Sequence, residues 1–142
     1  MGSMNRMESY EKEAIDCYHR WLKAFNSRDI EGMIQEMHFP HWRISGTNSL
    51  QVWQTKERQR RLHDGMTESL NAEGWTKTVT NGLTVINSSV NKVHLSMRQS
   101  RVDQYGQEYN GFDTLWIICL IGGKWGAQFR SSFSSGVSET GI

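Results

Sequence analysis

The sequence predicts an α+β fold in which three N-terminal helices pack on a strongly curved, mostly antiparallel sheet. Three observations predict this fold. Apolar residues recur at helical spacing in the first half of the chain, runs rich in Thr, Val and Trp follow residue 75, and Gly122-Gly123 joins two β-rich runs as a hairpin turn would. Helices gathered at one end of an antiparallel sheet are typical of the α+β class. A twisted sheet wrapped around a long first helix then encloses a cone-shaped cavity.

The first two helices follow from a regular apolar stripe and from residues that stop a helix. Ser9 can cap the first helix, which ends at Asn26-Ser27-Arg28. Asp29 can cap a second, shorter helix, which ends before Phe39-Pro40 because a residue preceding proline is pushed out of the helical region. The apolar stripe of the first helix consists of Ala14, Tyr18, Trp21, Leu22 and Phe25.

The third helix is predicted to start after Thr55, which can cap it, and to run to about Ala72. Gly74 is placed to end it in a left-handed conformation, which glycine adopts without steric cost. Two short strands, residues 41–45 and 50–53, are expected between the second and third helices. The basic cluster at residues 56–61 is expected on the solvated face of the third helix.

The second half of the chain is predicted to be β-structure. Residues 75–86 contain Asn81-Gly82, which can be a hairpin turn or a bulge in one long strand, and the short flanking segments favour the bulge. Residues 92–102 form the next strand, with Val93, Leu95 and Met97 alternating with polar residues such as His94. Periodicity leaves open which of these two sets faces the helices. Residues 103–106 then turn the chain into the final hairpin.

The final hairpin carries an unbroken apolar run from Leu115 to Ile121. A strand with one wet face alternates in polarity, so this run indicates that both faces are covered. The helices of the chain can cover one face, and a second copy of the chain is the simplest cover for the other. We therefore expect a homodimer formed through the outer sheet face, with Trp116, Ile118 and Leu120 in the interface.

Composition limits the function further. The 142 residues suffice for one domain, expected at residues 8–134, between a tag or disordered start (1–7) and a flexible tail (135–142). The net charge of +1 argues against nucleic-acid partners, and no apolar run is long enough to span a membrane. The first residues lack an apolar leader, so we expect a cytoplasmic protein with reduced Cys17 and Cys119.

The corner between the first two helices resembles a known family. Residues 25–32 contain Asn26, Asp29 and Gly32, and they resemble the N-x-x-D-x-x-G corner of NTF2-like proteins, which include SnoaL-like polyketide cyclases and ketosteroid isomerases. The final hairpin, with its Gly-Phe-Asp-Thr-Leu-Trp, Gly-Lys-Trp-Gly and Arg-Ser-Ser-Phe segments, resembles the end of the same fold. The resemblance spans roughly Tyr10 to Phe133. It implies the cone-shaped fold and no particular activity, because this fold carries enzymes, binding modules and assembly domains.

Catalytic positions of the isomerases carry over only in part. The tyrosine that binds the developing oxyanion corresponds to Trp21, with Tyr18 one turn earlier, and the general-base aspartate corresponds to Ser45. The second acid corresponds to Asp113. Steroid-type proton transfer is therefore not expected, since it requires a carboxylate base. A cyclase-like pair of Asp113 with His41 or His94 stays open.

Strand parity, extended from this alignment, predicts which side chains line the cone. These are His41, Arg43 and Ser45 from the first strand, Asp113, and Gln128, Arg130 and Ser132 from the last strand, with Trp42 and Trp53 expected at the mouth. Two arginines suit an anionic or polar ligand, because guanidinium binds carboxylate or phosphate in a two-pronged geometry. The alternative is an internal ion pair of Asp113 with Arg43 or Arg130 that fills the cavity.

Three functions follow as hypotheses. The first is a domain that binds a small polar or anionic organic molecule in the cone, with Tyr18, Trp21 and His94 among the contacts. The second is an isomerase, cyclase or dehydratase that uses Asp113 and His41 as acid and base. The third is a dimeric assembly domain. No cofactor is expected, and no metal, because Pro40 and the change from helix to strand keep His38 and His41 from converging.

Overall fold

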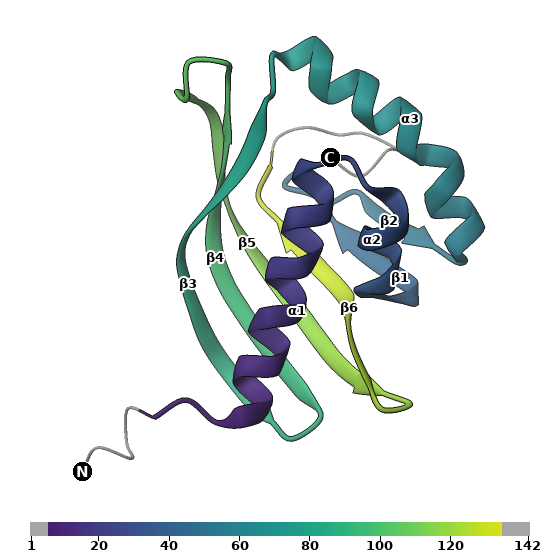
Figure 1. Cartoon of the computed structure of the whole chain (residues 1–142), viewed down its shortest axis with the longest axis vertical. Helices are drawn as coiled ribbons and strands as arrows, with labels where there is room; N and C mark the ends of the chain where they lie inside the picture. Colours follow the sequence, from purple (N-terminus) through teal and green to yellow (C-terminus); the bar gives the residue numbers. More distant parts are fainter. Residues whose placement is uncertain (1–5, 135–142) are drawn as a thin grey trace.

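The computed structural model describes residues 6–134, which form three α-helices and six β-strands (Figure 1). The predicted tail at 135–142 and residues 1–5 of the predicted start lie outside this range. The helices are α1 (Ser9–Asn26), α2 (Ile30–Gln35) and α3 (Lys56–Glu73), and the strands are β1 (Met37–Ile44), β2 (Leu50–Trp53), β3 (Lys77–Ser89), β4 (Lys92–Val102), β5 (Glu108–Ile121) and β6 (Lys124–Ser132).

The six strands form one sheet in the order β2-β1-β6-β5-β4-β3. All neighbouring pairs are antiparallel except β1 and β6, which are parallel. The α+β class and the mostly antiparallel sheet are thus confirmed. The register of β3 against β4 shifts between Asn81 and Thr84, so the bulge is confirmed over the hairpin turn.

The packing of the helices differs from the prediction. Only α1 lies along the sheet, where it contacts β3, β4, β5 and β6, while α3 contacts α2 and β2 at one end of the molecule (Figure 1). The three helices therefore do not share one layer on the sheet. The physical reason is the narrow apolar stripe of α3, whose buried side chains are few: Gln59, His63, Met66 and Leu70.

Local capping signals account for the helix ends. The Asp29 side chain accepts a hydrogen bond from the Gly32 N–H at 3.1 Å, and the Thr55 hydroxyl accepts one from the Arg58 N–H at 3.2 Å. Gly74 adopts φ 87°, as predicted. The cap of α1 is Glu8 rather than Ser9, because Glu8 forms a reciprocal capping box with Glu11.

Strand β1 begins at Met37, four residues earlier than predicted, and runs through Phe39-Pro40. Proline cannot donate a backbone hydrogen bond, so it fits a strand only at an edge or an irregularity. The pairing of β1 with β6 shifts between Met37 and Trp42, and Pro40 lies within that irregular segment.

The faces of β5 are the reverse of the prediction. Phe112, Thr114, Trp116 and Ile118 are buried under α1, with Trp116 at 1% and Ile118 at 0% exposure. Leu120 is partly buried and packs against the same core. The expectation that Trp116, Ile118 and Leu120 cover a dimer interface is therefore wrong. The Trp116 ring instead packs edge-on against Tyr18 and Trp21, with centroid distances of 4.9 and 4.7 Å.

The opposite face of the sheet also carries apolar side chains. We call the partly exposed group on β1, β5 and β6 the outer apolar patch: Trp42, Ile44, Leu115, Ile117 and Phe129. Phe129 is paired in register with both Trp42 and Ile117, so the patch is continuous across three strands.

Candidate functional site

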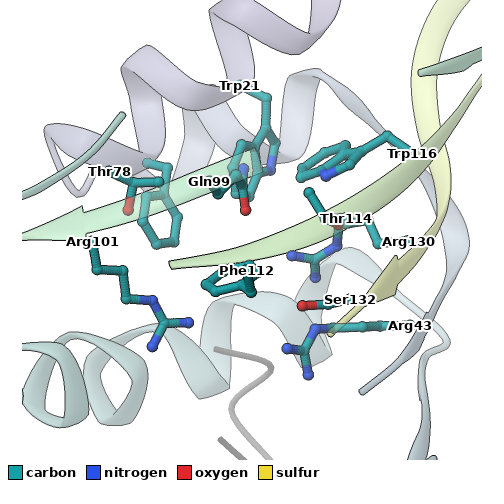
Figure 2. Close-up of a pocket in the computed structure, with 11 residues that line it drawn as sticks. Trp21, Arg43, Thr78, Gln99, Arg101, Phe112, Thr114, Trp116, Arg130 and Ser132 are labelled. Atoms are coloured by element: carbon teal, nitrogen blue, oxygen red, sulfur yellow. The ribbon is translucent and has the colours of Figure 1, made fainter. Parts of the chain in front are cut away.

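A cavity that is partly open to solvent lies between α1 and the inner face of the sheet. Figure 2 shows the side chains around it, which come from α1 and from strands β1, β3, β4, β5 and β6. The lining combines arginines, aromatic rings and small polar groups: Trp21, Phe25, Arg43, Thr78, Gln99, Arg101, Phe112, Thr114, Trp116, Arg130 and Ser132.

Arg130 is held by His41, which is fully buried behind the lining. His41 Nδ1 lies 2.9 Å from the Ala127 carbonyl oxygen, which can only accept, so Nδ1 carries the proton. His41 Nε2 therefore accepts a hydrogen bond from Arg130 Nε, at 3.0 Å. Burial, reinforced by the nearby Arg130 charge, holds the pKa of His41 well below its usual value. His41 is thus a neutral acceptor that orients the Arg130 guanidinium.

Aromatic rings surround the same guanidinium. Its central carbon lies 5.3 Å from the Trp116 ring centroid and 5.7 Å from each of the Trp21 and Trp53 centroids. Cation–π contacts of this kind stabilise the charge without neutralising it. Burial, followed by repulsion from Arg43, lowers the pKa of Arg130 to about 9. Arg130 therefore remains positive at neutral pH.

Two further arginines lie along the cavity. Arg43 Nη1 donates to Gln51 Oε1 at 3.1 Å, and burial lowers the pKa of Arg43 to about 10. Arg101 pairs with Glu73 at the end of α3, with 3.1 Å between Nη1 and Oε1, and lies over the Phe112 ring at 5.3 Å. In Figure 2, Arg101 lies on the opposite side of the group from Arg43 and Arg130.

Negative charge is scarce around this cavity. None of the described lining residues carries a carboxylate, and the Glu73 carboxylate binds Arg101. The predicted ion pair of Asp113 with Arg43 or Arg130 does not form, because Asp113 is exposed on the outer face of the sheet. The arginines therefore give the cavity a positive potential in a partly enclosed, low-dielectric space.

Two hydrogen-bond donors in the lining have no partner. The indole Nε1 atoms of Trp21 and Trp116 are buried and form no hydrogen bond within the part of the chain that the structure describes. The two rings lie next to each other beside the Arg130 guanidinium (Figure 2). We refer to Trp21, Trp116 and Arg130 as the indole end of the cavity.

Two predicted site residues, Asp113 and His94, lie on the outer face and do not reach the cavity. Inward-facing Phe112 and Thr114 flank Asp113, and Val93 and Leu95 flank His94, so strand alternation directs both outward. The predicted placement of Asp113 in the cone is wrong, and the alternative left open for residues 92–102 is the one with Val93, Leu95 and Met97 inside, so His94 is not a cavity contact. Asp113 and His41 are consequently on opposite sides of the sheet and do not form an acid–base pair.

Tyr18 and Trp53 lie behind the lining rather than in it. The Tyr18 hydroxyl bonds Thr80 Oγ1 at 2.6 Å and accepts from Gln99 Nε2 at 2.9 Å, so Tyr18 positions a lining residue. Trp53 is 1% exposed, and its ring centroid lies 5.7 Å from the central carbon of the Arg130 guanidinium. Both residues thus support the site without lining it.

The remaining predictions divide between the lining and the turns. Arg43, Arg130 and Ser132 line the cavity, as expected from parity, and Trp21 does so as expected from the resemblance. Ser45 does not, because its hydroxyl accepts the backbone N–H groups of the following turn at 3.1 and 3.3 Å.

Gln128 also lies outside the lining. It falls at the register shift between β5 and β6, where Ala127 pairs with Ile118 and Phe129 pairs with Ile117, and it donates to the Pro40 carbonyl. This extra residue changes the parity of β6, which the sequence pattern did not reveal.

Several lining residues were not predicted: Phe25, Thr78, Gln99, Arg101, Phe112, Thr114 and Trp116. Alternation in β4 could have identified two of them. If Val93, Leu95 and Met97 are assigned to the core, Gln99 and Arg101 follow on the same face.

Two wider features of the chain bear on function. Among residues 6–134, no three His, Cys, Asp or Glu side chains are grouped as metal ligands would be. Within the same range, no helix has both the length and the apolar character required to span a bilayer.

A family model described as "NTF2-like protein (DUF6841)" matches residues 11–126. Similar solved structures include an NTF2-like protein with a cystatin-like fold from Novosphingobium aromaticivorans, at 14% identity and a TM-score of 0.72, covering 99% of this chain and 91% of that one. An NTF2-like protein from Cytophaga hutchinsonii is 16% identical, with a TM-score of 0.66 and coverage of 90% and 99%. No curated protein matches the sequence.

A ketosteroid isomerase-like protein from Erwinia carotovora atroseptica has 12% identity and a TM-score of 0.65, with coverage of 89% of this chain and 96% of that chain. At such identities the likeness concerns the fold alone. The fold predicted from the helix corner and the final hairpin is thereby confirmed.

Proposed function

The chain belongs to the NTF2-like family (DUF6841), and we propose that it binds a small anionic organic molecule in the cavity between α1 and the sheet. The observation that carries this proposal is Arg130. Its guanidinium is enclosed by three indole rings and hydrogen-bonded to a neutral histidine, with no carboxylate among its contacts in the described chain. A charge enclosed in this way is costly unless an anion compensates it.

The rest of the lining supports an organic ligand rather than a bare ion. Phe25, Phe112 and the two indole rings supply apolar walls, while Thr78, Gln99 and the arginines supply polar contacts. Binding pockets for small molecules typically combine apolar walls with a few polar groups that orient the ligand.

Calorimetric titration with sodium benzoate tests this proposal, with neutral benzamide and inorganic phosphate as comparison ligands. Arg130→Met should weaken benzoate binding by about tenfold or more, since a hydrogen-bonded charge pair contributes about 1.5–3 kcal/mol. Arg98→Met is the matched control, because Arg98 lies on the outer face and pairs with Glu108. If neither benzoate nor phosphate binds the wild-type protein, the proposal fails.

We further propose that the outer apolar patch pairs with the same patch of a second copy, giving a homodimer. Continuous apolar patches on one sheet face are typical of protein–protein contacts. Phe129→Asp, in the middle of the patch, should shift the sedimentation coefficient from a dimer to a monomer. Tyr105→Asp, in the exposed turn before β5, should leave it unchanged. A wild-type protein that sediments as a monomer at high concentration contradicts this proposal.

A further inference from the structure

The unpartnered indole groups allow the ligand of the proposed function to be described more closely. We propose that its anionic group is a carboxylate bound at the indole end, where it accepts hydrogen bonds from Trp21 Nε1, Trp116 Nε1 and the Arg130 guanidinium. The ligand class is a monocarboxylate on a flat apolar body, such as an aryl carboxylate. This inference rests on the proposed anion-binding function and adds the position and the chemistry of the anionic group.

The first argument is the state of the two indole groups. Buried polar atoms in folded proteins almost always have a hydrogen-bond partner, and an unpaired buried donor costs about 1–3 kcal/mol. Trp21 and Trp116 are 4% and 1% exposed, their rings touch, and both nitrogen atoms lack a partner in the described chain. Two such donors next to each other in a cavity wall indicate that a ligand bound in the cavity supplies their hydrogen-bond acceptor.

A buried tryptophan outside the cavity gives the contrasting case. Trp75 is also buried, but its indole N–H donates to the Thr78 hydroxyl at 3.0 Å. Trp125, on β6, donates its indole N–H to Glu13 of α1 at 3.0 Å. The indole groups of Trp75 and Trp125 thus have partners, and the two at the indole end do not.

The second argument is the orientation of Arg130. His41 binds its Nε atom, and the terminal nitrogen atoms form no other hydrogen bond within the described residues. The two terminal N–H groups of a guanidinium match the two oxygens of a carboxylate. Arg130 therefore presents a two-pronged donor next to the indole groups, with its direction fixed by His41.

Counting donors and acceptors favours a carboxylate over a phosphate. A carboxylate has two oxygens with about four acceptor sites, which two indole N–H groups and two guanidinium N–H groups can fill. The nearby Thr114 hydroxyl already donates to the Ser131 carbonyl at 3.0 Å, so it adds no donor. A phosphate dianion would bring more oxygens and more charge into a wall made largely of aromatic rings, and it would bind less well.

The test uses the indole N–H resonances of uniformly 15N-labelled protein. The chain has six tryptophans, and six Trp→Phe variants assign their indole signals one at a time. On titration with sodium benzoate, the Trp21 and Trp116 signals should move downfield and exchange more slowly with solvent, as expected for donors that gain an acceptor. The Trp42, Trp75 and Trp125 signals should stay in place.

Affinity supplies the second measurement. Trp21→Phe and Trp116→Phe keep an aromatic ring but remove the N–H group, and each should weaken benzoate binding about 5- to 10-fold. Trp125→Phe removes an indole group that already has a partner, Glu13, and neither residue lines the cavity, so it should leave the affinity unchanged. Phosphate should bind more weakly than benzoate to the wild-type protein.

The outcomes separate the two proposals. If benzoate binds and depends on Arg130 while the Trp21 and Trp116 signals do not move, the carboxylate lies elsewhere in the cavity and this inference is overturned, but the proposed function stands. If phosphate binds more tightly than benzoate, the assignment of a carboxylate is overturned. If no anion binds, the proposed function and this inference both fail.

Discussion

Both faces of the sheet carry apolar side chains, but the arginines on the two faces differ in their hydrogen-bond partners. On the outer face, Arg98 lies 3.0 Å from the Glu108 carboxylate, and Ser100 donates to the same group at 2.5 Å. On the inner face, the Arg130 guanidinium donates a hydrogen bond to a neutral imidazole and lies against indole rings. Arg98 on the outer face is thus paired with a carboxylate of the chain, whereas Arg130 is oriented without being neutralised.

This difference bears on how a binding site is distinguished from a structural network. An arginine that merely fills a core is usually paired with a carboxylate, because an unpaired buried charge is costly. Here the acceptor is a histidine whose own proton is fixed by the Ala127 carbonyl. That arrangement fixes the direction of the guanidinium and leaves its charge available to a ligand.

The two faces should differ most in how much an alanine substitution lowers the free energy of unfolding. Trp116→Ala removes a side chain that is 1% exposed and packs on α1, so the free energy of unfolding should fall by about 3–5 kcal/mol. Leu115→Ala removes a partly exposed neighbour on the outer face and should cost clearly less. Urea unfolding, at a concentration where the protein is monomeric, measures both. Equal losses would contradict the assigned faces of β5.

The pH dependence of stability should reflect the buried His41. Its pKa in the folded protein lies well below the usual value of about 6.5, so below pH 6.5 the unfolded chain takes up a proton that the folded chain does not. The free energy of unfolding should therefore decrease as the pH falls, by about 1.4 kcal/mol per pH unit from this group.

Two variants isolate that contribution. His41→Gln should reduce the slope between pH 6.5 and 5, and His94→Gln, on the outer face, should preserve it. His63 adds a slope of the same sign in both variants, because burial also lowers its pKa. Identical slopes for the two variants would show that His41 takes up a proton between pH 6.5 and 5 as readily in the folded protein as in the unfolded chain, which contradicts the lowered pKa.

The sequence predicted best those features that depend on a few neighbouring residues. Asp29, Thr55 and Gly74 were identified as helix-end residues because caps depend on a few neighbouring residues. The bulge at Asn81-Gly82 and the Gly122-Gly123 turn were predicted for the same reason.

The orientation of strands was harder to predict. The run from Leu115 to Ile121 is apolar on both faces, so it has no period of two from which its inner face could be recognised. Asp113 was therefore placed by family analogy and assigned to the wrong face. Arg43 and Arg130 were placed correctly, but the position of the His41 proton on Nδ1 is fixed by the Ala127 carbonyl, which is 86 residues away in the chain.

A smaller effect is expected at the hydrogen bonds behind the cavity. Tyr18→Phe removes the hydroxyl that bonds Thr80 and Gln99, and it should lower the free energy of unfolding by about 1 kcal/mol. It should also weaken benzoate binding slightly, since Gln99 lines the cavity and loses its acceptor. Tyr105→Phe, at an exposed turn, serves as the control for loss of a hydroxyl. A Tyr18→Phe protein as stable as this control would contradict the predicted contribution of the buried network.

The smallest effect should come from the paired charges of the outer face. Arg98 and the Glu108 carboxylate are both substantially exposed, so water and salt screen their attraction. Arg98→Met should leave the thermal midpoint and the benzoate affinity within experimental error at 0.15 M salt. A large loss of benzoate binding in Arg98→Met would mean that the anion interacts with the outer face as well. The absence of a carboxylate partner at Arg130, compared with the Arg98–Glu108 pair, would then no longer identify the anion-binding site.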